Sequence, residues 1–319
     1  MIYKFEIRPQ KYNKFQLTLW DIMNIENMQN IIYLIIHILF ALGLFISLKF
    51  INIRNLNKYQ AITINYAIAF TVTTSSFLIE GVDIQYDTKL LLPSVIVGVL
   101  FVSSFLAMTI CTKRVGIGLT TSLNKMSVVI PVTMGILFLG QKDEIEIKIA
   151  GISLALISFI LILYKKTDER SKGGIILPVL VFLLPGLIDS SMEITKTLII
   201  SKSGESEMFL SGVFSTALIL STVLVIYDRK RDKIKEPFRY ETLIFGGALG
   251  LFNFLTSKML LINVGLMGGS VVFPVHNASV VMLTALTGLL FFGEKFSRRQ
   301  WAGVVIAVVA VFVIAATLK

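Results

Sequence analysis

The sequence predicts an all-α integral membrane protein with about ten transmembrane helices arranged as two inverted five-helix repeats. Three observations lead to this prediction: an apolar composition, apolar blocks of membrane-spanning length, and a self-match between the two halves. The 319 residues are 55% hydrophobic and only 16% charged, with a mean hydropathy of +0.80. Soluble domains usually have about a quarter of their residues charged.

The apolar residues occur in long blocks rather than in amphipathic patterns. A hydrocarbon core about 30 Å thick requires roughly 20 apolar residues per helix. Blocks of that length follow one another along almost the whole chain, which predicts helices at residues 31–50, 61–80, 90–111, 116–140, 146–164, 175–200, 208–227, 242–264, 267–292 and 301–318.

The first thirty residues are polar, mixed in charge and without the apolar core of a signal peptide. We interpret residues 1–30 as a polar N-terminal tail. Because the stretch from Met23 reads as a natural beginning of the chain, residues 1–22 are interpreted as a loose or over-extended start. The first repeat then covers residues 31–165 and the second covers residues 174–318.

The net charge of +10 does not indicate a nucleic-acid partner, because most Lys and Arg residues lie in the connectors between apolar blocks. This pattern is typical of the positive-inside rule. Counting alternate connectors favours both termini outside, although four basic residues of the N-terminal tail count against that orientation. Cys111 is the single cysteine, which excludes an internal disulfide and a multi-cysteine metal site.

The most informative pattern is the self-match between the two halves. Asn124 and Gly140 are as far apart as Asn277 and Gly293, and each glycine lies in a similar turn, FLGQK or FFGEK. The turns are followed by IAGI and WAGV, which share a glycine in the next helix. Similar apolar composition explains the apolar letters, but not the shared asparagine, turn and glycine.

Each half holds an odd number of predicted helices, so the two copies must insert with opposite orientation. Inverted repeats of this kind place a binding site near the bilayer midplane and give alternating access when one repeat rocks against the other. The architecture therefore predicts transport of a small molecule before any substrate residue is considered.

The FLGQK and FFGEK helix pairs resemble those of the drug/metabolite transporter superfamily, EamA-like branch. The resemblance covers nearly all of the chain from about residue 31. It departs at Gln141, where the second half keeps the expected acid as Glu294. The resemblance implies an exporter or exchanger of small metabolites such as amino acids, sugar phosphates or nucleotide sugars.

Two lysines within predicted helices, Lys125 and Lys258, are the sharpest candidates for substrate contact. A buried ionisable group costs at least ~2.5–3.5 kcal/mol on insertion scales, so it normally faces a cavity or a partner. A lysine presents a point charge to a carboxylate or phosphate. In the superfamily that the chain resembles, the sugar-phosphate and nucleotide-sugar branches use buried Lys or Arg residues in this way. We therefore predict an organic-anion or amino-acid-like substrate.

The sixth predicted helix carries Asp189, Glu193 and Lys196 on one face, at i, i+4 and i+7. Pro185 and Gly186 stand one turn earlier, where a helix can open and line a cavity. The stripe is compatible with a translocation pathway. It is equally compatible with salt bridges that hold the halves together, Lys196 with Glu193 and Lys125 with Asp189. Asp189, Glu193 and Lys196 are also candidates for proton coupling or gating, and burial favours the neutral form of the two acids.

His276, Asn277 and Asn124 are the remaining candidates for substrate binding. The two asparagines occupy matched positions of the repeats and can bond either substrate or a neighbouring helix, where such a bond contributes under ~1 kcal/mol on average. His276 is a candidate because it adjoins Asn277. His37 lies alone in the first predicted helix, and a lone histidine within a membrane more often forms a hydrogen bond between helices.

Other function classes find little support in the sequence. It contains no H-E-x-x-H, no G-x-S-x-G and no phosphate-binding G-x-x-x-x-G-K-[ST] motif, and its two histidines are far apart. An integral membrane enzyme is therefore an unlikely alternative, and we expect no catalytic residue, metal or cofactor. A flippase-like carrier of a lipid-linked sugar is the closer alternative. We expect a multi-pass protein in the lipid bilayer of the cell (inner or plasma) membrane.

Overall fold

The computed structural model describes residues 25–79, 88–138, 145–163, 176–202, 204–231 and 238–315. Within these ranges all regular structure is helical. Two 3-10 turns, η1 (Thr88–Leu90) and η2 (Met126–Val128), accompany the α-helices. The α-helices are α2 (Ile25–Ile53), α3 (Lys58–Ile79), α4 (Leu91–Val115), α5 (Ile117–Lys125), α6 (Val129–Phe138), α7 (Ile145–Leu163), α8 (Ile176–Leu198), α9 (Glu205–Arg231), α10 (Tyr240–Met267), α11 (Gly269–Phe292) and α12 (Arg298–Ala315).

Most helices follow the predicted apolar blocks to within a few residues. One prediction was wrong: the block at 116–140 is not one helix but α5, η2 and α6 in succession. In addition, α2 begins at Ile25, six residues before the predicted start. Residues 1–24 and Gln141 lie outside the described ranges.

Six helical segments in the described part of the chain are long and apolar enough to cross a membrane. They are Gln29–Ile53, Thr88–Val115, Ile176–Leu198, Glu205–Lys230, Tyr240–Met267 and Val275–Phe292. The protein is therefore an α-helical integral membrane protein. Ten crossings in two inverted repeats stay a prediction.

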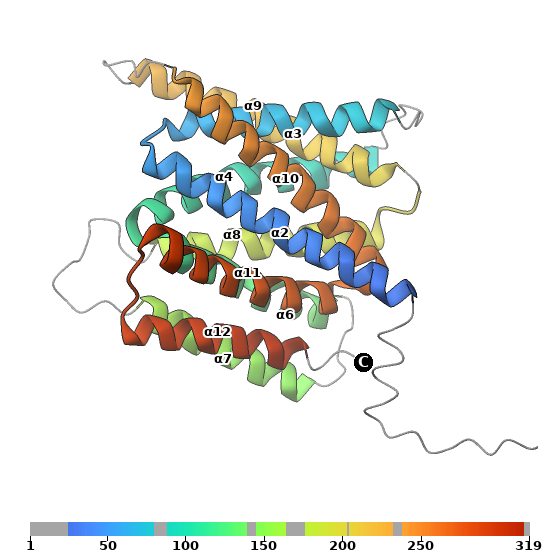
Figure 1. The fold of residues 1–319 in the computed structure, drawn as a ribbon. Helices are drawn as coiled ribbons and strands as arrows, with labels where there is room; N and C mark the ends of the chain where they lie inside the picture. Colours follow the sequence, from blue (N-terminus) through green and yellow to red (C-terminus); the bar gives the residue numbers. More distant parts are fainter. Residues whose placement is uncertain are drawn as a thin grey trace, which may run out of the picture.

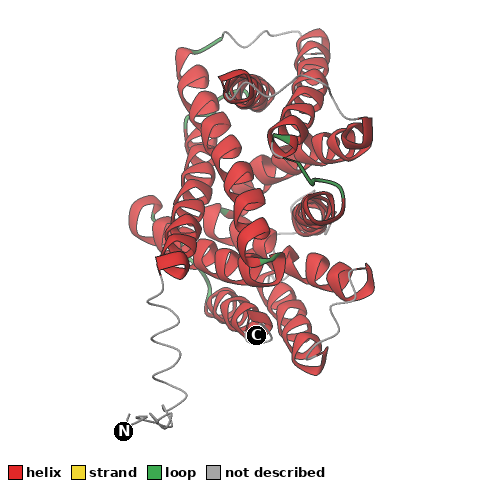
Figure 2. Ribbon diagram, turned by 90° about the vertical axis from the view of Figure 1, so that its right-hand side faces the viewer, coloured by secondary structure: helices red, strands yellow, loops and turns green. Residues whose placement is uncertain are grey.

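The helices form one bundle in which segments from both halves of the chain interleave. α3 packs against α9 at one end of the arrangement in Figure 1, and α7 packs against α12 at the other. Between them, α2 packs against α10 and α11, and α4 packs against α8 and α9. Figure 2 shows the same bundle turned by 90°. The interior is therefore built jointly by helices of both halves.

Apolar side chains cover the outside of the bundle as well as its core. Leu92, Ile176, Leu290 and Phe291 are each more than two-thirds exposed, with Phe291 at 79%. Soluble monomers rarely expose large contiguous apolar patches, so such a surface is suited to lipid. Polar side chains such as Asn65, Asn253 and Asn277 are instead buried inside.

Small residues bring the helices close together, as is typical of membrane bundles. At Gly250 of α10 a β-carbon would collide with the backbone carbonyl of Asn65 in α3. Beside this contact Asn253 donates a 3.2 Å hydrogen bond to the side-chain oxygen of Asn65. The close approach of α3 and α10 therefore connects the two halves through one polar contact near the middle of both helices.

Candidate functional site

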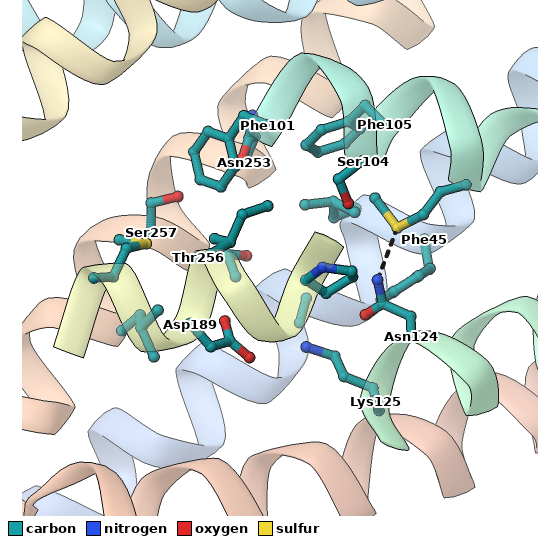
Figure 3. Close-up of a pocket in the computed structure, with 17 residues that line it drawn as sticks. Phe45, Phe101, Ser104, Phe105, Asn124, Lys125, Asp189, Asn253, Thr256 and Ser257 are labelled. Atoms are coloured by element: carbon teal, nitrogen blue, oxygen red, sulfur yellow. Dashed lines mark hydrogen bonds between the residues drawn. The ribbon is translucent and has the colours of Figure 1, made fainter. Parts of the chain in front are cut away.

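A cavity of about 90 Å³ lies inside the bundle (Figure 3). α2, α4 and α5 from the first half and α8 and α10 from the second contribute to its wall. The lining residues come from the middle of α4, α8 and α10, so the cavity lies near the midplane of the bundle. We call it the central cavity. Aromatic and aliphatic side chains form most of its wall, and the polar exceptions are Ser104, Asn124, Lys125, Asp189, Asn253, Thr256 and Ser257.

Lys125 reaches this cavity because the helix is interrupted directly after it. α5 ends at Lys125, the 3-10 turn η2 follows, and α6 starts at Val129. Pro131 has no N–H to donate to the carbonyl of Ser127 four residues earlier, and its ring clashes with that carbonyl in a regular α-helix. Interrupted helices at membrane depth are tolerated where they line a cavity.

The other wall at this point is α8, which continues through Pro185 without a break. The helix does not open at Pro185 and Gly186 in this conformation, although Pro185 lines the cavity. Gly186 instead allows close packing, because a β-carbon there would lie 2.8 Å from the backbone oxygen of Ser127. The opened turn is therefore in η2, and Gly186 of α8 packs directly against it.

Lys125 and Asp189 point toward one another from facing walls of the central cavity (Figure 3). Ion pairs in the described part of the chain include Lys49–Glu294, Arg54–Glu241, Lys89–Glu205, Arg239–Glu241 and Lys258–Glu207. Neither Lys125–Asp189 nor Lys196–Glu193 is among them, so the salt bridges considered from the sequence do not form in this conformation. One lysine and one aspartate therefore face this cavity from different helices.

Asn124 lines the central cavity beside Lys125, and its amide donates a 3.1 Å hydrogen bond to the sulfur of Met108 in α4 (Figure 3). Its repeat counterpart Asn277 does not line the cavity. Asn277 is fully buried, and its side-chain oxygen lies 3.2 Å from Nδ1 of His276. The two matched asparagines therefore have different surroundings.

His37 and His276 form a buried stacked pair between α2 and α11, with ring centroids 3.9 Å apart. Nδ1 of His37 lies 3.3 Å from the amide nitrogen of Asn263 in α10. Neither histidine lines the central cavity. This arrangement favours a role for both histidines in packing α2, α10 and α11 together. No sequence signal predicts a contact between two histidines so far apart in the chain.

Lys258 and Lys196 lie away from the central cavity, in a second pocket between α8, α9 and α10. The structure therefore separates Lys258 from Lys125, although both were predicted as contacts of one anionic group. Glu193 is buried at 6% exposure and packs against Gly269 at the start of α11. Of the predicted site residues, the structure brings together Asn124, Lys125 and Asp189.

Sequence reasoning missed the polar residues that α4 and α10 add to the central cavity, namely Ser104, Asn253, Thr256 and Ser257. Uncharged side chains are common in membrane helices and carry no signal of their own. Among these four residues, Asn253 could have been noticed in the sequence, because burying an amide in hydrocarbon is costly.

Glu294 of the FFGEK turn is a second omission. Its carboxylate accepts hydrogen bonds from the backbone N–H groups of Ile117 and Gly118, at 2.6 and 3.1 Å. It also pairs with Lys49 of α2 at 2.6 Å. The acid of the repeated turn therefore caps α5 of the opposite half, an arrangement favoured by the positive end of the helix dipole.

Comparison with known proteins finds a family match in the second half of the chain. Residues 176–316 match the EamA-like transporter family. Because of this match, we call residues 176–316 the EamA-like domain. This result confirms the resemblance to the drug/metabolite transporter superfamily that the repeated turns indicated. The EamA-like domain includes Asp189 and the α10 wall of the central cavity.

Two further similarities extend over most of the chain. An uncharacterized protein of Haemophilus influenzae is 25% identical over 291 residues, which are 88% of this chain and 96% of that protein. A protein with a crystal structure superposes with a TM-score of 0.61 at 12% identity, over 91% of this chain and 96% of that chain. The second similarity shows a shared fold. The match of residues 176–316 to the EamA-like transporter family, together with the six candidate membrane spans, points to a multi-pass membrane protein of transporter type rather than an enzyme.

Proposed function

We propose that the protein is a secondary transporter, an exporter or exchanger, that moves a small metabolite across the cell (inner or plasma) membrane. In this proposal ten helices form two inverted repeats, residues 31–165 and 174–318, which rock against each other around the central cavity. Support comes from the EamA-like domain and from a midplane cavity whose wall is shared by both halves.

The observation that carries the substrate class is the opposition of Lys125 and Asp189 across the central cavity (Figure 3). A solute with a carboxylate at one end and an ammonium group at the other matches these two walls. Charge-assisted hydrogen bonds are roughly twice as strong as neutral ones. We therefore propose an amino-acid-like solute, with Asn124 available to bond its polar atoms.

The size of the cavity also favours a small solute over a lipid-linked sugar. The central cavity holds about 90 Å³, whereas pockets for drug-sized ligands measure roughly 300–1,000 Å³. Each water molecule needs about 10–15 Å³ of such space, so the cavity has room for roughly six to nine water molecules or a solute of similar size. A lipid-linked sugar does not fit in this conformation.

Exchange in liposomes tests the proposal. Purified protein is reconstituted with an internal amino-acid mixture, and uptake of a labelled 2-amino acid is compared with that of the 2-hydroxy acid of the same carbon skeleton. We expect the amino acid to be preferred. Asp189→Asn is expected to reduce that preference about 10-fold or more, because a charged hydrogen bond contributes ~1.5–3 kcal/mol.

Glu146→Gln is the matched control, because it neutralises an exposed carboxylate in the first turn of α7, away from the central cavity. Its preference should equal that of the unaltered protein. Uptake of neither compound, or an unchanged preference in Asp189→Asn, would contradict the amino-acid-like assignment.

We further propose that Glu193 couples transport to protons. Its side chain is buried against the first residue of α11, Gly269, so gain and loss of a proton changes the charge at a helix contact between elements of the second half. We expect an imposed proton gradient to accelerate uptake by the unaltered protein. Glu193→Gln should keep gradient-free exchange and lose the acceleration. Rates indifferent to pH and to the gradient would remove this role.

A further inference from the structure

A second pocket of about 220 Å³ lies where α8 ends, α9 begins and α10 passes them. Three lysines contribute to its lining, Lys196 from α8, Lys202 from the connector and Lys258 from α10. The three lysines come from three different segments of the chain rather than from one helix face. We call it the lysine pocket. It shares no lining residue with the central cavity.

The described lining of the lysine pocket carries more positive than negative charge. Among these residues Glu207 is the one carboxylate, so three lysines and one glutamate give a formal net charge of +2. Glu207 lies 3.4 Å from Lys258. The adjacent Glu205 is directed elsewhere, to Lys89 at 3.0 Å and to the backbone N–H groups of Ser201 and Lys202 at 2.7 and 3.0 Å.

Lys196 is held in place without a carboxylate. Its ammonium group donates a 3.3 Å hydrogen bond to the hydroxyl of Ser206. Gly265 of α10 lies against the end of the same side chain, since a β-carbon there would be 3.0 Å from Cε of Lys196. An ammonium group has three protons to donate, so Lys196 has further donors for a ligand while its position stays defined.

The start of α9 adds to the positive potential of the lysine pocket. This helix runs for 27 residues from Glu205, and Ser206 and Glu207 of its first turn line the pocket. The N-terminal end of a helix carries a partial positive charge and exposes N–H groups that have no partner within the helix. The three lysines and the helix end therefore favour the same kind of ligand, an anion.

We propose that the lysine pocket is a second anion-binding site, separate from the central cavity, which takes a phosphate or carboxylate group. The pocket adjoins the central cavity along α10, where Leu260 lines one and Leu261 the other. An anion held there stands next to the path that the proposed function requires, but the assignment rests on the lysine pocket alone. Its ligand comes either from a soluble metabolite or from the headgroup of an anionic lipid.

Binding to the full-length protein in an uncharged detergent tests the site. Inorganic phosphate is titrated against chloride at constant ionic strength, and the thermal unfolding midpoint is followed. A short-chain phosphatidylglycerol is titrated in parallel. We expect at least one of the two phosphate probes to stabilise the protein. Lys196→Gln with Lys202→Gln should raise the apparent Kd of that probe about tenfold or more, because charged hydrogen bonds are lost.

The comparison variants separate this site from others. Lys113→Gln, at an exposed position in the last turn of α4, removes a similar charge elsewhere and should leave the affinity unchanged. Lys125→Gln tests the central cavity. Phosphate binding that is lost in Lys125→Gln but kept in the Lys196/Lys202 variant would overturn the proposal, as would an absence of binding by both probes.

The two probes also distinguish the sources of the anion. Lysine-dependent binding of inorganic phosphate supports a soluble ligand, whereas lysine-dependent binding of the phospholipid alone supports a headgroup. Both results support the site. Failure of the amino-acid exchange assay leaves this result unaffected, because no transport is measured here.

Discussion

Lys125→Ala is expected to lower exchange of the transported solute by about 10- to 100-fold. Its ammonium group faces the central cavity opposite Asp189 (Figure 3), and loss of one charged hydrogen bond costs ~1.5–3 kcal/mol. Lys125→Arg should recover only part of the activity, since a planar guanidinium does not replace a point charge in a small cavity. Initial rates in reconstituted liposomes give the comparison.

Lys113→Ala is the control for Lys125→Ala, because Lys113 is exposed in the last turn of α4. Lys258→Ala makes a second comparison, since Lys258 lines the lysine pocket and not the central cavity. Its effect on amino-acid exchange should be clearly smaller than that of Lys125→Ala. Parental rates in Lys125→Ala would exclude a substrate contact at this residue.

Glu294→Ala is expected to lower the free energy of unfolding by about 3–5 kcal/mol, the usual cost of removing one partner of a buried ion pair. The side chain of Glu294 is 8% exposed and that of Lys49 is 14% exposed. The substitution also leaves the N–H groups of Ile117 and Gly118 without their acceptor. Glu294→Gln keeps an acceptor oxygen and should cost less. Denaturant unfolding in mixed micelles measures the difference.

Glu241→Ala is the matched control for Glu294→Ala. Glu241 pairs with Arg54 and with Arg239, whose side chains are 54% and 46% exposed. Pairs with an exposed partner usually contribute only ~0–1 kcal/mol, so this variant should stay close to the unaltered protein. An equal decrease in the free energy of unfolding in both variants would contradict a special contribution of Glu294 to stability.

The repeated turns show which features of this protein can be predicted from its sequence. FLGQK and FFGEK led to the predicted repeat and to the resemblance to the superfamily. The family match of residues 176–316 then confirmed the resemblance, whereas the repeat stays a prediction. The role of Glu294 was beyond sequence reasoning, because its partner Lys49 lies 245 residues away and its other partners are backbone groups of α5. A motif shows that a residue type recurs, whereas its partner is chosen by packing.

The break at η2 is a different case, because a signal for it is present in the sequence. Pro131 lies four residues after Ser127, within an apolar block long enough for one uninterrupted helix. The length of that block favoured a single helix, and the effect of the proline was overlooked. Pro185 has the opposite outcome in α8. A proline alone therefore does not decide where a membrane helix opens, and packing against neighbouring helices does.

By itself, the sequence determined that this chain is an α-helical membrane protein, where most of its helices lie, and that its second half has EamA-like character. These properties follow from the length and polarity of each segment, because every segment that spans the bilayer must itself be long and apolar enough and must satisfy its own backbone hydrogen bonds. Only the tertiary structure decided that Lys125 faces Asp189 across a cavity while Lys258 joins Lys196 and Lys202 in another. Which buried charges meet depends on how distant helices cross, and residue spacing along the chain does not contain that information.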